Sequence, residues 1–234
     1  MEPRETIDFE YALTFEDGEV IHVTARLDGE DLSLRSSSDV PPPDWARVER
    51  IGCEECPLRQ RPAAVCPVAA ALAALVARFA HRLSHEPVRL EVRGPERTYC
   101  GTAPLQRALS SLTGIYMVSA GCPIFDKLRP MVRFHLPLAS EDETVFRAVG
   151  MYFIAQYLVE RQGGAPDWRL DGLVQLYRHV HRANCRIAAA IRDAAALDAS
   201  ANALVCLDLF TSDVEWSVRD SLSDLARLFA NSDL

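Results

Sequence analysis

The sequence contains no run of apolar residues long enough to cross a bilayer as a helix. Residues 1–6 also lack the basic and then apolar pattern of a signal peptide. We therefore expect a cytoplasmic protein that is not embedded in a membrane. The chain has seven cysteines, and in a reducing cytoplasm clustered cysteines are more often metal ligands or redox groups than structural disulfides.

The sequence also has no excess of basic over acidic residues. The formal net charge is -8 at pH 7, which argues against a nucleic-acid-binding protein because such proteins present basic surfaces to phosphate. The sequence has no P-loop, no G-x-G-x-x-G and no G-x-S-x-G motif, so nucleotide binding and serine hydrolysis have no motif support. Its 49% hydrophobic and 25% charged residues are typical of a globular protein that buries a core.

Four cysteines are distinguished by their spacing and by the residues that follow them. Cys53 and Cys56 form a C-x-x-C pair, Cys66 lies shortly after it, and Cys122 stands far downstream. Proline directly follows Cys56, Cys66 and Cys122, and proline favours the first position of a helix. Each of these three is therefore predicted to be a helix N-cap, where a thiolate faces unpaired backbone N–H groups and the helix dipole. Together with Cys53 they predict a four-sulfur metal site.

The pattern favours a [4Fe–4S] cluster over zinc. Zinc knuckles usually bring two close cysteine pairs together on glycine-rich turns, whereas this chain has one pair and no glycine after Cys56. Sulfur ligands scattered over helix starts suit an iron–sulfur cluster better. Structural zinc is the alternative cofactor, and cysteines that are simply buried without a metal are the third interpretation.

The segment that follows Cys122 supplies the other predicted site residues. Lys127, Arg129 and Arg133 are expected to offset the negative charge of a cluster or to bind an anion beside it. His135 is expected in the same outer layer, with replacement of one cysteine ligand as an alternative. His135 is also the one base close enough in sequence to activate Cys122 as a nucleophile. No residue is assigned a catalytic role.

The remaining three cysteines carry less information. Cys185 and Cys206 fall within apolar helical patterns and are expected to pack in the core. Cys100 lies near a predicted loop, and it is the one cysteine that the sequence offers as a substitute ligand.

Apolar periodicity divides the chain into a short β-rich start and a long helical remainder. Strands are predicted by alternation over residues 7–15, 20–25, 32–34, 45–51 and 88–92. Helices are predicted over residues 68–83, 103–119, 140–161, 171–195, 202–210 and 213–229. Ser140 with Glu143, and Ser212 with Glu215, have the spacing of capping boxes.

These elements predict an α+β protein, in which a small N-terminal antiparallel β-meander packs on a mostly helical body. The predicted units are residues 1–52, the β-subdomain, and residues 53–234, the helical domain with the cysteine site. One continuous domain is the alternative. The helix over residues 140–161 is expected to be the central core helix, because its apolar belt is too wide for a surface helix.

Several runs of this chain resemble the signature of a bacterial family of unknown function. They are SAGCPIFDKLRPMVRFHLP at residues 119–137, CEECP at 53–57, CPVA at 66–69, PDW at 166–168 and LDGL at 170–173. The resemblance extends over most of the chain. It implies a bacterial cytoplasmic protein and supplies no reaction.

The sequence leads to three expectations about function. The first is an iron–sulfur protein in electron transfer or in redox or gas sensing, with a redox or other protein partner. The second is a zinc-stabilised interaction module without catalysis. The third is a cysteine-dependent enzyme that uses Cys122 and His135. The sequence predicts no substrate and no oligomeric state.

Overall fold

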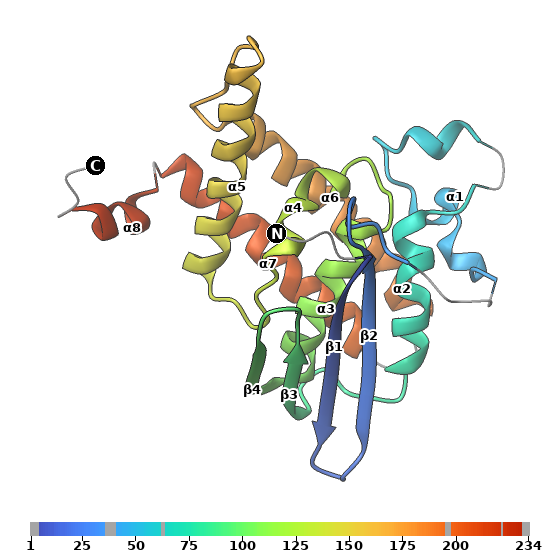
Figure 1. Cartoon of the computed structure of the whole chain (residues 1–234). Helices are drawn as coiled ribbons and strands as arrows, with labels where there is room; N and C mark the ends of the chain where they lie inside the picture. Colours follow the sequence, from blue (N-terminus) through green and yellow to red (C-terminus); the bar gives the residue numbers. More distant parts are fainter. Residues whose placement is uncertain (1–4, 36–40, 62–63, 195–197, 221, 231–234) are drawn as a thin grey trace.

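A computed structural model describes residues 5–35, 41–61, 64–194, 198–220 and 222–230 of the chain. Two β-hairpins form one antiparallel sheet with strand order β2-β1-β3-β4 (Figure 1). The first hairpin contains β1 (Thr6–Phe15) and β2 (Val20–Asp28), and the second contains β3 (Pro87–Arg93) and β4 (Thr98–Pro104). The N-terminal hairpin therefore shares its sheet with residues that come much later in the chain.

Alternation of apolar and polar residues gives this sheet one buried face. In β1, Phe9, Tyr11 and Leu13 are buried. Glu10, which lies between Phe9 and Tyr11, and Thr14, which follows Leu13, are exposed. The strands β2 and β3 repeat the pattern. Because successive side chains of a strand point to opposite faces, all the buried residues lie on the side that meets the core. The strands predicted for the first hairpin and for residues 88–92 are confirmed.

Other strand predictions differ from the structure. Residues 32–34 contribute only an isolated β-bridge from Leu34 to Leu27, and Leu32 has a positive φ of 60°, which interrupts extended backbone. Residues 45–51 form a 3-10 helix (Asp44–Ala46) and α1 (Val48–Ile51) instead of a strand. Over so few residues, one buried side of a short helix gives nearly the same apolar pattern as a strand. The strand β4 was not predicted, because Cys100 and Gly101 break its apolar alternation.

The helical body confirms the α+β class. Its longer helices are α2 (Pro67–Arg78), α3 (Leu105–Ser119), α5 (Glu141–Arg161), α6 (Asp171–Ala194) and α7 (Ala199–Arg219). The shorter ones are η2 (Pro57–Gln60), η3 (Phe125–Leu128), α4 (Pro130–Arg133), α8 (Ser223–Ala226) and η4 (Arg227–Phe229). The helix α3 contacts the sheet, α2 and α7, and so lies at the centre of the molecule. The predicted end of α6 at residue 195 lies outside the described residues.

The prediction that α5 is the central core helix is wrong. Only its first turns are buried, at Val145, Ala148 and Val149, and the rest of the helix projects beyond the body (Figure 1). On the projecting part, Ile154 and Tyr157 expose more than half of their surface. The apolar belt predicted the helix correctly, but periodicity does not determine what covers a helix.

The prediction of two helices over residues 202–229 also needs correction. One helix, α7, runs through Ser212, which therefore lies in a helix interior and caps nothing. The sequence of α7 contains neither glycine nor proline to stop it. Within this helix, buried Thr211 accepts a hydrogen bond from the Asn184 side chain at 3.3 Å, which ties α7 to α6.

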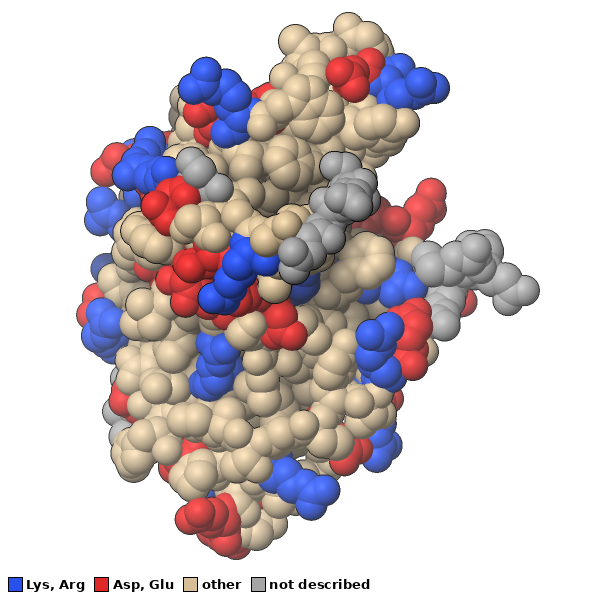
Figure 2. Space-filling model, turned by 90° about the vertical axis from the view of Figure 1, so that its left-hand side faces the viewer, with Lys and Arg blue, Asp and Glu red and all other residues tan. Residues whose placement is uncertain are grey.

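One face of the molecule is mixed in charge. On the face seen in Figure 2, basic and acidic side chains lie interspersed over the described residues, without a broad field of one sign. Within the described parts of the chain, no helix combines the length and the apolar character needed to cross a membrane.

Two serine substitutions test these helix boundaries. Ser140 accepts a hydrogen bond from the Glu143 backbone N–H, and the Glu143 side chain accepts one from the Ser140 N–H, so α5 begins with a complete capping box. Ser140→Ala is expected to lower the free energy of unfolding by about 1 kcal/mol. Ser212→Ala is the matched control, and it should leave stability unchanged or slightly higher because alanine is the better residue in a helix interior. Urea unfolding measures both, and an equal loss in the two variants would contradict the observed boundaries.

Candidate metal centre

The four predicted cysteines line one small cavity of about 20 Å³. Cys53 follows α1, Cys56 precedes η2, Cys66 precedes α2, and Cys122 follows α3. Cys66 is buried and the other three are partly buried. The remaining lining is apolar and includes Ile187 of α6. The structure therefore brings together four thiols that come from three separate segments of the chain.

Backbone hydrogen bonds fix the first two of these segments against each other. The Cys66 N–H donates to the Ala46 carbonyl at 2.8 Å, and the Val48 N–H donates to the Ala64 carbonyl at 2.9 Å. Gly52 ends α1 with a left-handed backbone (φ +69°), a conformation that glycine adopts without strain, and this turns the chain at Cys53. The C-x-x-C turn and the start of α2 are thereby held side by side.

The predicted N-cap positions are confirmed for two cysteines. Cys56 is the N-cap of η2 and Cys66 is the N-cap of α2, each with extended backbone and proline as the next residue. For Cys122 the prediction is wrong in detail, because η3 begins at Phe125 with Ile124 as its N-cap. Even so, the Asp126 N–H donates to the Cys122 carbonyl at 2.8 Å, which closes a helical turn directly after this cysteine.

Burial and mutual repulsion favour the protonated form of the Cys53, Cys66 and Cys122 thiols by raising the pKa of each. Burial raises the pKa of Cys53 to about 12, and the neighbouring thiols of Cys66, Cys56 and Cys122 add to this effect. Burial also raises the pKa of Cys66 and of Cys122. The backbone N–H groups that follow each of these two residues oppose the rise. A cation bound among the four sulfurs would have to replace their protons.

The four sulfur atoms are not arranged as a preformed zinc site. Among the described residues, no three of the four cysteine sulfurs all lie within 4.8 Å of one another. With a Zn–S bond of about 2.3 Å, the sulfurs of a tetrahedral zinc site lie about 3.8 Å apart. Cysteines on a cluster are held farther apart, because the iron and sulfide core lies between them.

Side chains of α6 place positive charge beside the C-x-x-C turn. Arg182 and His179 pair with Glu55, the histidine at 3.3 Å, and Arg186 pairs with Glu54 at 3.4 Å. The charge of Arg186 also favours the thiolate form of Cys53. The same three α6 residues border a groove of about 170 Å³ next to Cys53. Sequence reasoning missed this contribution, although Arg182 and Arg186 have the spacing of one helical face.

The basic residues predicted for this role lie elsewhere. Arg129 pairs with Asp126 at 2.5 Å, and Arg133 pairs with Glu96 at 2.8 Å. Lys127 is exposed on η3. None of the three lines the cysteine cavity.

His135 faces the sheet and a different cavity. A hydrogen bond of 2.5 Å joins the Tyr11 hydroxyl to Nε2 of His135, and the His135 ring meets Phe9 edge-on at 5.1 Å between centroids. Burial lowers the pKa of His135 to about 3, so the ring is neutral at physiological pH. Within the described residues no hydrogen bond joins His135 to Cys122, and His135 is not in contact with the cysteine cavity.

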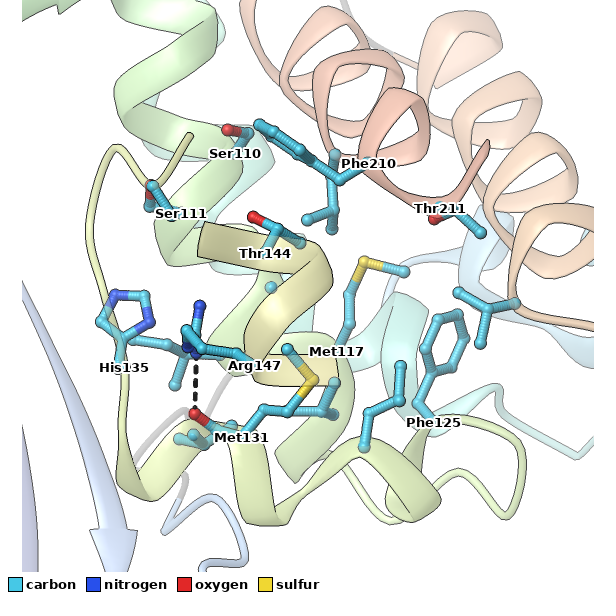
Figure 3. Close-up of a pocket in the computed structure, with 18 of the residues that line it drawn as sticks. Ser110, Ser111, Met117, Phe125, Met131, His135, Thr144, Arg147, Phe210 and Thr211 are labelled. Carbon is cyan, nitrogen blue, oxygen red and sulfur yellow. Dashed lines mark hydrogen bonds between the residues drawn. The ribbon is translucent and has the colours of Figure 1, made fainter. Parts of the chain in front are cut away.

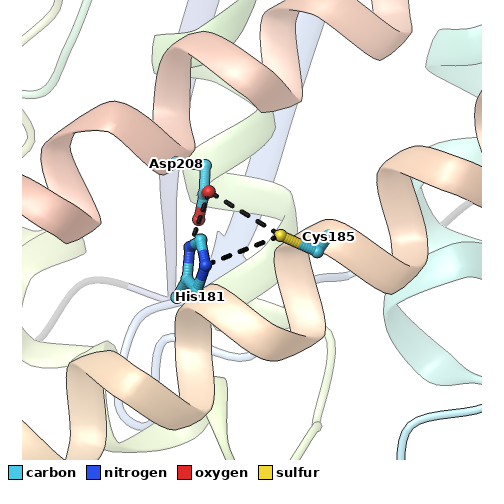
Figure 4. A group of neighbouring side chains, drawn as sticks. All are labelled: His181, Cys185 and Asp208. Atoms are coloured by element: carbon cyan, nitrogen blue, oxygen red, sulfur yellow. Dashed lines mark hydrogen bonds and ion pairs between the residues drawn. The ribbon is translucent and has the colours of Figure 1, made fainter.

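Cys185 takes part in an arrangement that the sequence did not predict. It is exposed on α6 rather than packed in the core, with its sulfur 3.8 Å from His181 Nε2 and 4.0 Å from Asp208 Oδ2 (Figure 4). His181 Nδ1 lies 2.8 Å from the same carboxylate. The three groups contain metal-ligating atoms within 4.8 Å of one another. The His181–Asp208 ion pair is sufficient to explain the arrangement. Cys100 is exposed on β4, Cys206 is partly buried on α7, and neither reaches the cysteine cavity.

Thiol accessibility provides a test of these placements. In reduced, metal-free protein at mildly alkaline pH, we expect iodoacetamide to modify exposed Cys100 much faster than Cys66. Cys66 is buried and its pKa is raised, and the thiolate is the reactive form. Peptide mass spectrometry follows both sites, and protein unfolded in urea serves as the control in which the rates should converge. Equal rates in the folded protein would contradict the burial of Cys66.

Comparison with known proteins gives a family but no described activity. The family model described as "Domain of unknown function (DUF6901)" matches residues 9–230. No curated protein and no solved structure matches the chain. The match includes all four cysteines of the cavity and nearly the whole fold. The chain belongs to the DUF6901 family, a family of unknown function.

Proposed function

We propose that this protein binds a [4Fe–4S] cluster through Cys53, Cys56, Cys66 and Cys122 and acts in electron transfer or in redox or gas sensing. The observation that supports this proposal is the convergence of four thiols on one cavity, where no three of the sulfurs all lie within 4.8 Å of one another. An all-sulfur ligand set is typical of such clusters.

The surroundings of the cavity suit an anionic cluster. Backbone N–H groups at the start of α2 lie near Cys66, and the guanidinium of Arg186 lies on the side of Cys53. Positive groups of this kind stabilise the charge of the cluster and tune its reduction potential. Cys53 and Cys56 are only partly buried, so this side of the site is where a redox partner would exchange electrons.

A structural zinc ion is the second candidate, and one observation favours it. The cavity of about 20 Å³ has room for a group of about the size of a water molecule. A single ion would need the sulfurs to move inward, whereas a cluster would need the cavity to expand. The C-x-x-C turn is the part that would move, since the ion pairs of Glu54 and Glu55 with α6 are largely exposed.

Metal analysis of protein purified without oxygen tests the proposal. We expect about four irons and four acid-labile sulfides per chain, with a brown colour and absorption at about 400 nm. Cys66→Ser and Cys122→Ser should lose most of the iron and the absorption. Cys100→Ser is the matched control and should retain both, because its side chain is remote from the cavity.

The alternatives give different results. One zinc per chain without colour would overturn the cluster and establish the second candidate. The absence of both metals from the wild-type protein and after anaerobic reconstitution would overturn both. Circular dichroism of each variant shows whether metal loss reflects a missing ligand or a failure to fold.

A further inference from the structure

A second, larger cavity of about 150 Å³ (Figure 3) shares Phe125 with the cysteine cavity as a lining residue. It is bordered by α3, α5, α6, α7 and the segment that carries η3 and α4, and it is open on one side. Most of the lining is apolar, with contributions that include Ile115, Met117, Leu128, Met131, Leu207 and Phe210. Its volume is comparable to that of a cavity that accommodates benzene.

The charged groups of this cavity are all of one sign. Two arginines, Arg107 and Arg147, line it, and no aspartate or glutamate does. In the described part of the chain, neither arginine has a carboxylate oxygen within 4.0 Å. Glu143 interacts electrostatically with Arg147, and Asp213 with Arg107, but neither carboxylate forms an ion pair with its arginine. Glu143 is instead engaged in the cap of α5.

Arg147 in particular has hydrogen-bonding capacity that the protein does not use. One terminal N–H donates to the Met131 carbonyl at 3.0 Å (Figure 3). Its buried Nε has no hydrogen-bond partner among the described residues, and neither has the Oδ1 of buried Asn184, which lines the same cavity. Burial lowers the pKa of Arg147, because a guanidinium removed from water loses part of its solvation.

Arg107 is held more completely. One N–H donates to the Ala139 carbonyl, and the guanidinium lies 4.4 Å above the centre of the Phe210 ring. Its charge is nevertheless not matched by a carboxylate. Buried or half-buried guanidinium groups are normally paired with anions, because an uncompensated charge in such a place is unfavourable.

We propose that this cavity binds a small apolar monocarboxylate. The carboxylate would pair with Arg147, for which a planar guanidinium is well suited. A ring or chain of about six carbon atoms would occupy the apolar space toward Met117 and Phe125. The proposal depends on the two arginines and the cavity, and it holds whether the cysteine site takes iron, zinc or no metal.

The chemistry of binding is tested with charged ligands and their neutral isosteres. Phenylacetate and hexanoate are titrated into the full-length protein by isothermal calorimetry, beside phenylacetamide and hexanamide. The amides match the acids in shape but carry no charge. We expect at least one acid to bind and to raise the melting temperature, and its amide to bind at least about tenfold more weakly.

Arginine variants test the assignment of the charge. Arg147→Met should weaken binding of the acid at least about tenfold, with a smaller loss in Arg107→Met. Arg192→Met is the matched control, because Arg192 is an exposed arginine of α6 outside the cavity. Without ligand, Arg147→Met should melt at the same temperature as the wild type or higher, since it removes an unpaired charge from a half-buried position.

Three results of the binding measurements would each overturn the proposal on their own. They are the absence of binding by both acids at millimolar concentration, equal binding of acids and amides, and unchanged acid binding in Arg147→Met. A lower melting temperature of ligand-free Arg147→Met, with acid binding retained, would assign Arg147 a structural role through the Met131 carbonyl and would equally overturn it.

Discussion

The enclosure of α3 between the sheet and α7 is the constraint on which the rest of the structure depends. Its side chains at Leu105, Leu112 and Ile115 are almost fully buried, and they leave the helix no exposed side along which to shift. The helix begins directly after β4, and it ends where Gly121 adopts a left-handed backbone (φ +82°). Its fixed position therefore determines where Cys122 enters the cysteine cavity and where the following segment lies.

That segment connects the two candidate sites. Cys122 and Phe125 line the cysteine cavity. Phe125 and Met131 line the larger cavity that contains Arg107 and Arg147, the arginine-bearing cavity. The helix α6 does the same from the opposite side, because Ala183 faces the cysteines and Asn184 faces the larger cavity. The two cavities therefore share Phe125 and adjacent positions of α6 in their walls.

Local patterns in the sequence predicted what local physics determines. The alternation around Tyr11, the cap at Ser140 and the N-cap positions of Cys56 and Cys66 each depend on residues a few positions apart. Proline after cysteine was informative for the same reason.

The pairing of Glu54 with Arg186 could not be predicted in this way, because it depends on how helices that are distant in the sequence pack. Likewise, the apolar positions of α5 predict a helix but contain no information about whether other elements cover it. The arginine-bearing cavity was missed because its two cations lie on different helices.

The strand order of the sheet has a consequence for synthesis of the chain on the ribosome. The hairpin β1–β2 is complete once Asp28 has emerged, but β1 pairs on its other side with β3, which ends at Arg93. At ordinary elongation rates, the interval between these two points is on the order of several seconds. During that time the apolar face around Phe9 and the free edge of β1 have no partner, so the nascent chain offers a binding surface for chaperones that the finished protein no longer has.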